Sequence, residues 1–69
     1  MKLDNRGLEP PQPMMRTLAA LEELPESEEL IINNDRRPMF LYEELDNRGY
    51  KHETIELADG SFQITIRKS

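Results

Sequence analysis

The sequence contains no cysteine among its 69 residues. Disulfide bonds, thiolate metal sites and every mechanism with a cysteine nucleophile are therefore excluded. No run of about 18 apolar residues is present, so no segment has the length of a membrane-spanning helix. Residues 1–4 also lack the apolar core of a signal peptide. These absences predict a cytoplasmic protein with no membrane partner.

Basic residues are the scarcer charge, with 9 Lys and Arg against 14 Asp and Glu and a net charge of −5. Because this excess opposes docking onto a polyanion, we expect no nucleic-acid partner. The length corresponds to one small domain, residues 1–69. With 36% apolar residues, little stability remains after the chain is ordered, so we expect marginal stability or help from a partner.

Residues that could carry catalysis are also few. His52 is the single histidine, and it has no second nitrogen or sulfur ligand nearby in sequence to complete a metal site, so we expect it to be an exposed spacer. Glu43, Glu44 and Asp46 lie on the outward side of a predicted helix, where nothing would shift a carboxyl pKa toward neutrality. Phosphate-loop, nucleophile-elbow and zinc-helix motifs are absent. We therefore expect no enzymatic activity, no metal and no cofactor.

Two segments have the periodicity of amphipathic helices. In residues 11–24, Met14, Leu18 and Leu21 recur at helical spacing, and prolines at 11 and 13 fit the first turn. Residues 38–48 form the second helix, with Pro38, Leu41, Tyr42 and Leu45 on one stripe. We expect Asp35 to cap its start and Gly49 to end it.

The remaining apolar segments predict strands. Leu3 belongs to a short first strand, and Leu30, Ile31 and Ile32 form a buried one. Asp59-Gly60 predicts a two-residue hairpin turn, which pairs Ala58 with Ser61. One hairpin face is then apolar and the other polar. The apolar pairs are Leu57 with Phe62 and Ile55 with Ile64, and the polar pairs are Glu56 with Gln63, Thr54 with Thr65 and His52 with Arg67.

The order of these elements predicts an α/β (α+β) two-layer sandwich, β-α-β-α-β-β. A four-stranded mixed sheet would carry both helices on its apolar face. Its polar face would be open to solvent.

The segment LDNRGLEPPQPMM, residues 3–15, resembles the TusA/SirA-like signature Leu-Asp-x-x-Gly-Leu-x-Cys-Pro-x-Pro-hydrophobic-Met. The likeness continues to the C-terminal hairpin and implies the same β-α-β-α-β-β fold. Pro10 stands where the sulfur carriers of that family have their cysteine. Asp35-x-x-Pro38 and Arg48-Gly49-Tyr50 resemble the cysteine-less DUF2249 branch, for which the resemblance implies no activity.

Two surfaces at the helix starts are candidates for binding. Arg36 and Arg37 lie beside the free amides of the second helix and could seat a small anion, or they could pair with Asp35 or the acidic loop. Met39 and Phe40 could supply an apolar contact, if Phe40 is exposed rather than tilted into the core. Pro10, Pro11 and Pro13 begin the other helix at the same end of the β-α-β unit and would form the opposite lip.

The sequence therefore predicts a non-enzymatic binding or regulatory domain that acts through contact with another protein. The alternative is a small-anion or ligand-binding module at the helix N-termini. A sulfur-relay-associated protein is the third hypothesis. Sulfur carriage itself needs a thiolate, which neither Pro10 nor the thioethers of Met14 and Met15 can provide.

Overall fold

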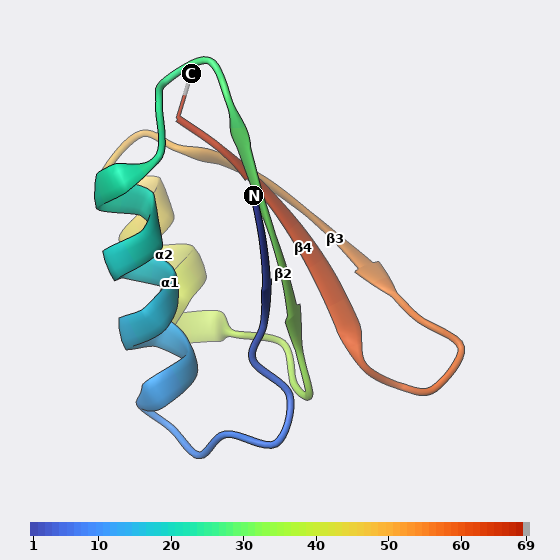
Figure 1. Ribbon diagram of the computed structural model, residues 1–69. Helices are drawn as coiled ribbons and strands as arrows, with labels where there is room; N and C mark the ends of the chain where they lie inside the picture. Colours follow the sequence, from blue (N-terminus) through green and yellow to red (C-terminus); the bar gives the residue numbers. More distant parts are fainter. Residues whose placement is uncertain (69) are drawn as a thin grey trace.

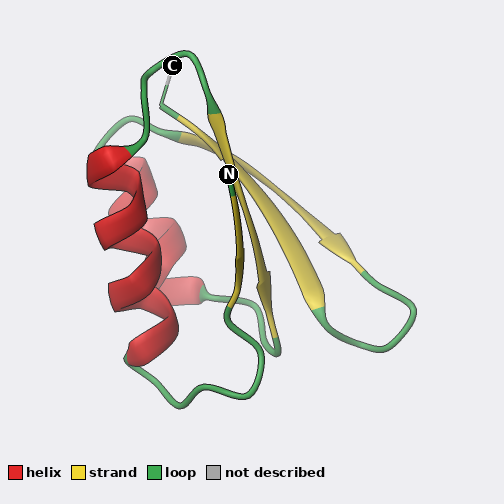
Figure 2. Cartoon of the chain, viewed as in Figure 1, coloured by secondary structure: helices red, strands yellow, loops and turns green. Residues whose placement is uncertain are grey.

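The computed structural model describes residues 1–68, and these residues form two layers (Figure 1). Along the chain they are β1 (Lys2–Asp4), α1 (Gln12–Glu23), β2 (Glu29–Asn34), α2 (Met39–Asn47), β3 (Lys51–Glu56) and β4 (Phe62–Arg67). The strand order in the sheet is β1-β2-β4-β3, with β1 parallel to β2 and the other neighbours antiparallel. Both helices lie on one face of the sheet (Figure 2). The predicted order of elements, mixed sheet and two-layer arrangement are confirmed.

The core lies between the helices and the central strands. Its buried residues are leucines of the two helices and alternate residues of β2 and β4: Leu21, Leu24, Leu41, Leu45, Leu30, Ile32, Ile64 and Ile66. Because strand side chains alternate between faces, Ile31 points to the other face and is only half-buried. The expectation that all of Leu30, Ile31 and Ile32 would be buried is wrong at Ile31.

The predicted hairpin register is wrong by one residue. Leu57 N donates to the carbonyl of Ser61, and Gly60 N donates to the carbonyl of Leu57. The loop therefore has three residues, and Gly60 alone in it has a positive φ, of 86°. The two-residue turn that we expected would need a positive φ at Asp59 as well, which an aspartate adopts at a cost.

A shift of one residue exchanges the two faces of β3. Ile55 pairs with Gln63 instead of Ile64, and Glu56 pairs with Phe62. Ile55 therefore lies on the open face, 56% exposed. His52 and Thr54, expected on the polar face, pair with Ile66 and Ile64 and face the helices.

The parallel pairing of β1 and β2 positions the candidate site. Parallel strands end at the same edge of a sheet, and each of these two leads into a helix. The N-termini of α1 and α2 therefore lie at the same end of the molecule, as expected. Within residues 1–68, no helix is long and apolar enough to cross a membrane.

Candidate functional site

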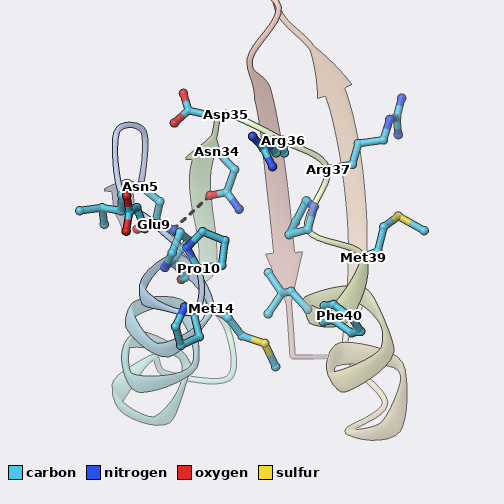
Figure 3. A pocket seen from close by; sticks show the side chains of 15 residues that line it. Asn5, Glu9, Pro10, Met14, Asn34, Asp35, Arg36, Arg37, Met39 and Phe40 are labelled. Atoms are coloured by element: carbon cyan, nitrogen blue, oxygen red, sulfur yellow. Dashed lines mark hydrogen bonds between the residues drawn. The ribbon is translucent and has the colours of Figure 1, made fainter.

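A pocket of about 520 Å³ lies between the starts of the two helices (Figure 3). All seven residues proposed from the sequence line it: Pro10, Pro11, Pro13, Arg36, Arg37, Met39 and Phe40. The loop after β1 and the start of α1 provide one wall. The loop after β2 and the start of α2 provide the other. The fold thus brings the two predicted surfaces together into one site.

Neither helix start is capped by a side chain. Pro11 and Pro38 occupy the N-cap positions, and a proline has no side-chain oxygen to accept from the first amides. The N–H groups of Met14, Phe40 and Leu41 accordingly have no acceptor among residues 1–68. The expectation that Asp35 caps the second helix is wrong, because its Oδ2 accepts from Gly7 N at 2.7 Å. Asp35 instead joins the two loops that form the pocket.

Phe40 is 78% exposed and Met39 is 63% exposed. The sequence left open whether Phe40 is exposed or buried, and the structure places it at the surface. Leu41 and Leu45 of the same helix fill the core instead. Two large apolar side chains next to each other in sequence therefore reach solvent at the mouth of the pocket. Isolated apolar residues are common on protein surfaces, whereas adjacent ones beside a pocket are typical of contact sites.

The two arginines have different surroundings. The guanidinium of Arg37 lies over the ring of Phe62, 4.9 Å from its centroid, and in Figure 3 its side chain extends away from the pocket. Arg36 makes no hydrogen bond, ion pair or ring contact with any of residues 1–68. Neither arginine pairs with Asp35, which was one of the two expectations. Arg36 thus supplies an unpaired positive charge to the pocket.

Three buried polar side chains form a network beneath the pocket. Asn5 Nδ2 lies 3.1 Å from Thr17 Oγ1, 3.1 Å from Asn34 Oδ1 and 3.4 Å from the carbonyl of Pro13. Thr17 Oγ1 itself donates to that carbonyl at 2.8 Å. Asn5 Oδ1 is buried and has no partner within the described part of the chain. Sequence reasoning missed these residues, because asparagines after a strand are typical of turns and carry no sign of burial.

His52 is outside the pocket and is not the exposed spacer we expected. Its ring stacks on Tyr42, with centroids 4.7 Å apart, and its Nε2 lies 3.1 Å from Asp46 Oδ1. The Tyr42 hydroxyl forms a hydrogen bond with Thr54 Oγ1. The shift in hairpin register brings His52 onto this face. The cluster packs α2 against β3, and within residues 1–68 no three His, Asp or Glu side chains gather as metal ligands.

A charged cluster lies on the loop after β1. Arg6 Nε donates to Asp4 Oδ1 at 2.9 Å, and Arg6 Nη1 lies 3.5 Å from Asp59 Oδ2 in the hairpin loop. The hydrogen bonds from Arg6 lower the pKa of Asp4 from 3.8 to about 2. Those from Ser61 lower the pKa of Asp59. Arg6 thereby holds the loop before α1 close to the hairpin.

Comparisons with known proteins agree with this fold. Residues 2–68 match the family described as "Uncharacterized conserved protein (DUF2249)". The chain is 38% identical over 69 residues to the "Putative sulfur carrier protein MJ0990" of Methanocaldococcus jannaschii, covering 97% of this chain and 92% of that protein. It is similar to the crystal structure of the SirA-like protein DSY4693 from Desulfitobacterium hafniense, with a TM-score of 0.84 and 28% identity, over 96% of this chain and 95% of the other.

Proposed function

Because this chain belongs to the DUF2249 family of the TusA/SirA-like group and has no cysteine, we propose that it is a non-enzymatic domain that binds another protein. The observation that carries the proposal is the exposure of Phe40 and Met39 at the mouth of a pocket. Burying two such side chains against a partner removes a large apolar area from water, which is the main source of affinity in protein contacts.

The charges around the pocket indicate what the partner presents. Arg36 is unpaired within residues 1–68, and Arg37 is exposed apart from its contact with Phe62. A carboxylate of the partner could accept charge-assisted hydrogen bonds from these guanidinium groups. The proposed partner is therefore a cytoplasmic protein whose contact surface combines apolar side chains with an acidic one. The prolines at 10, 11 and 13 form the facing wall of the pocket.

The proposal assigns no sulfur transfer to this chain, although a relative is described as a sulfur carrier. A carrier must form a persulfide on a thiolate, and Pro10 occupies the position where the family signature has cysteine. Incubation with a cysteine desulfurase and cysteine should leave the intact mass unchanged. A gain of one sulfur atom in the mass spectrum would contradict this part of the proposal.

The protein contact can be tested by site-specific photocrosslinking in cells that express the chain. A photoreactive phenylalanine analogue at position 40 should give one dominant adduct, identified by mass spectrometry. The same analogue at position 55 is the control, because Ile55 is also large, apolar and exposed but lies on the open sheet face. The adduct at position 40 should disappear in a Met39→Ser, Arg36→Gln background. Identical adducts at both positions, or none at position 40, would overturn the proposal.

A further inference from the structure

Asn34 presents an unused hydrogen-bond donor to the pocket. The residue is 5% exposed, and its Oδ1 accepts from Asn5 Nδ2. Its Nδ2 has no partner within residues 1–68, and Figure 3 shows this nitrogen turned toward the space between the helix starts. Asn34 Nδ2 is not fully enclosed, so this donor opens onto the pocket and is available to an acceptor there.

The network below Asn34 fixes that direction. Thr17 Oγ1 uses its proton on the carbonyl of Pro13, so it can only accept from Asn5. Asn5 turns its nitrogen toward Thr17 and Asn34, which leaves its own Oδ1 buried without a partner within residues 1–68, and Asn34 accepts through its oxygen. The amide nitrogen of Asn34 is left facing the pocket. A flip of Asn34 alone would place two donors against each other, so the orientation of Asn34 follows that of Asn5.

Further donors and a cation also line the pocket. Arg36 is unpaired among the described residues, and the N–H groups of Phe40 and Leu41 have no acceptor there. Of the two carboxylates that line the pocket, Asp35 is bound to Gly7 N, and Glu9 is exposed at the rim. The pocket thus combines N–H donors with the positive charge of the exposed Arg36, and these groups complement an anionic oxygen group.

The rest of the pocket is apolar. Pro11, Pro13, Met14 and Leu41 line it, and its volume of about 520 Å³ falls in the range typical of small-molecule sites. The net charge of −5 opposes a ligand with several negative charges. We propose that the pocket binds a small organic monocarboxylate with an apolar body, whose carboxylate accepts from Asn34 Nδ2 and pairs with Arg36.

This inference shares its pocket with the proposed function and rests on that site, but it names a free small ligand for the interior. The protein contact depends on the exposed Met39 and Phe40, whereas the carboxylate depends on the buried Asn34. An experiment can therefore contradict the protein contact or the carboxylate site without contradicting the other. Loss of carboxylate binding with the crosslink at position 40 retained would leave the protein contact standing, and the reverse result would leave the ligand site standing.

The test is calorimetric titration and amide chemical-shift mapping of the purified chain with acetate, hexanoate and octanoate. Each pair of added methylenes should strengthen binding by more than tenfold until the pocket is filled, since one buried methylene is worth about fourfold. Octanamide, which has the same body without the charge, should bind at least about tenfold more weakly than octanoate. Shifts should concentrate on residues 5, 34, 36 and 39–41.

Asn34→Asp is the diagnostic variant. It keeps an oxygen for Asn5 and replaces only the pocket-facing nitrogen by an oxygen, which repels a carboxylate. Octanoate should then bind at least about tenfold more weakly, with the amide spectrum still dispersed. If this variant does not fold, Arg36→Gln gives the same readout and should weaken binding severalfold. Arg67→Gln is the matched control: it removes one exposed arginine at the other end of the sheet and should leave binding unchanged.

Four results would overturn the inference. Octanamide binding as tightly as octanoate would show an apolar pocket with no carboxylate recognition. Phosphate or sulfate binding as tightly as octanoate would show a site for inorganic anions. Absence of binding at millimolar octanoate would show that no such ligand is held. Shifts confined to Ile31, Gln63 and Thr65 would place binding on the open sheet face.

Discussion

Arg6 forms ion pairs with Asp4 and Asp59, two aspartates that lie far apart from each other in the sequence. It donates to Asp4 two residues earlier and lies 3.5 Å from the carboxylate of Asp59. The pKa of Asp4 is lowered to about 2, first by the side-chain and then by the backbone hydrogen bond of Arg6. Because the folded pKa is depressed, the resulting stabilisation is present above the ordinary value of 3.8. It is lost as the pH falls from that value toward 2.

The change Arg6→Gln should raise the pKa of Asp4 from about 2 toward 3.8, since the largest cause of the shift is removed. The measurement is a titration of the side-chain carboxyl ¹³C of Asp4 by NMR. Arg48→Gln, which breaks a separate pair with Glu44, should leave the Asp4 titration where it is. An unchanged midpoint in Arg6→Gln would show that the bond does not persist in solution.

At the scale of the elements, the hairpin register can be tested by the free energy of unfolding of two isoleucine variants. Ile55 and Ile64 would face each other in the core if the loop had two residues, but Ile55 is 56% exposed and Ile64 is fully buried. The change Ile64→Val should therefore lower the free energy of unfolding by about 0.5–1.5 kcal/mol. The same change at Ile55 should cost less than about 0.5 kcal/mol. Urea denaturation checks both, and equal costs would favour the two-residue loop.

Features of the fold that depend on neighbouring residues could be predicted from the sequence, whereas features that depend on distant contacts could not. The helices, their proline starts and the order of the elements along the chain follow from periodicity and from local turn chemistry, and these predictions are confirmed. The register failed because Asp-Gly suits two loops: the Asp59 carboxylate accepts from Ser61 N and Oγ, which stabilises the longer one. Local preference cannot choose between these loops, and a difference of one residue exchanges every side chain on β3 between faces.

The candidate site also has a part that the sequence predicts and a part that it does not. The seven residues named from the sequence meet at one pocket because the parallel β1–β2 pair brings both helix starts to one end. The floor of the pocket was not predictable. Asn5 and Thr17 are buried because the loop after β1 lies against α1 and the end of β2, so their role depends on contacts that no local pattern encodes. The cap expected at Asp35 failed for a similar reason, since Gly7 competes for its carboxylate.

For the whole molecule, stability should be highest in the centre of the sheet. β2 and β4 each have two neighbours, whereas β1 and β3 are edges and β1 has three residues. In native-state hydrogen exchange, the amides of Ile32, Ile64 and Ile66 should exchange most slowly, with opening free energies close to global unfolding. The amide of Ala58 in the hairpin loop, which has no hydrogen bond within residues 1–68, should exchange far faster. Exchange at Leu3 as slow as at Ile64 would contradict this ranking.

The central position of β4 has a consequence for the chain during its synthesis. β4 follows all the other strands in the sequence, yet it lies between β2 and β3. A nascent chain that has emerged from the ribosome as far as residue 61 offers β2 only the short β1 as a neighbour, and β3 has none. Leu21, Leu30 and Leu45 must then wait, uncovered, for Ile64 and Ile66 to leave the ribosome. At about 5–20 residues per second, the 21 residues from Leu45 to Ile66 take about 1–4 seconds to follow, which is long enough for a chaperone to bind first.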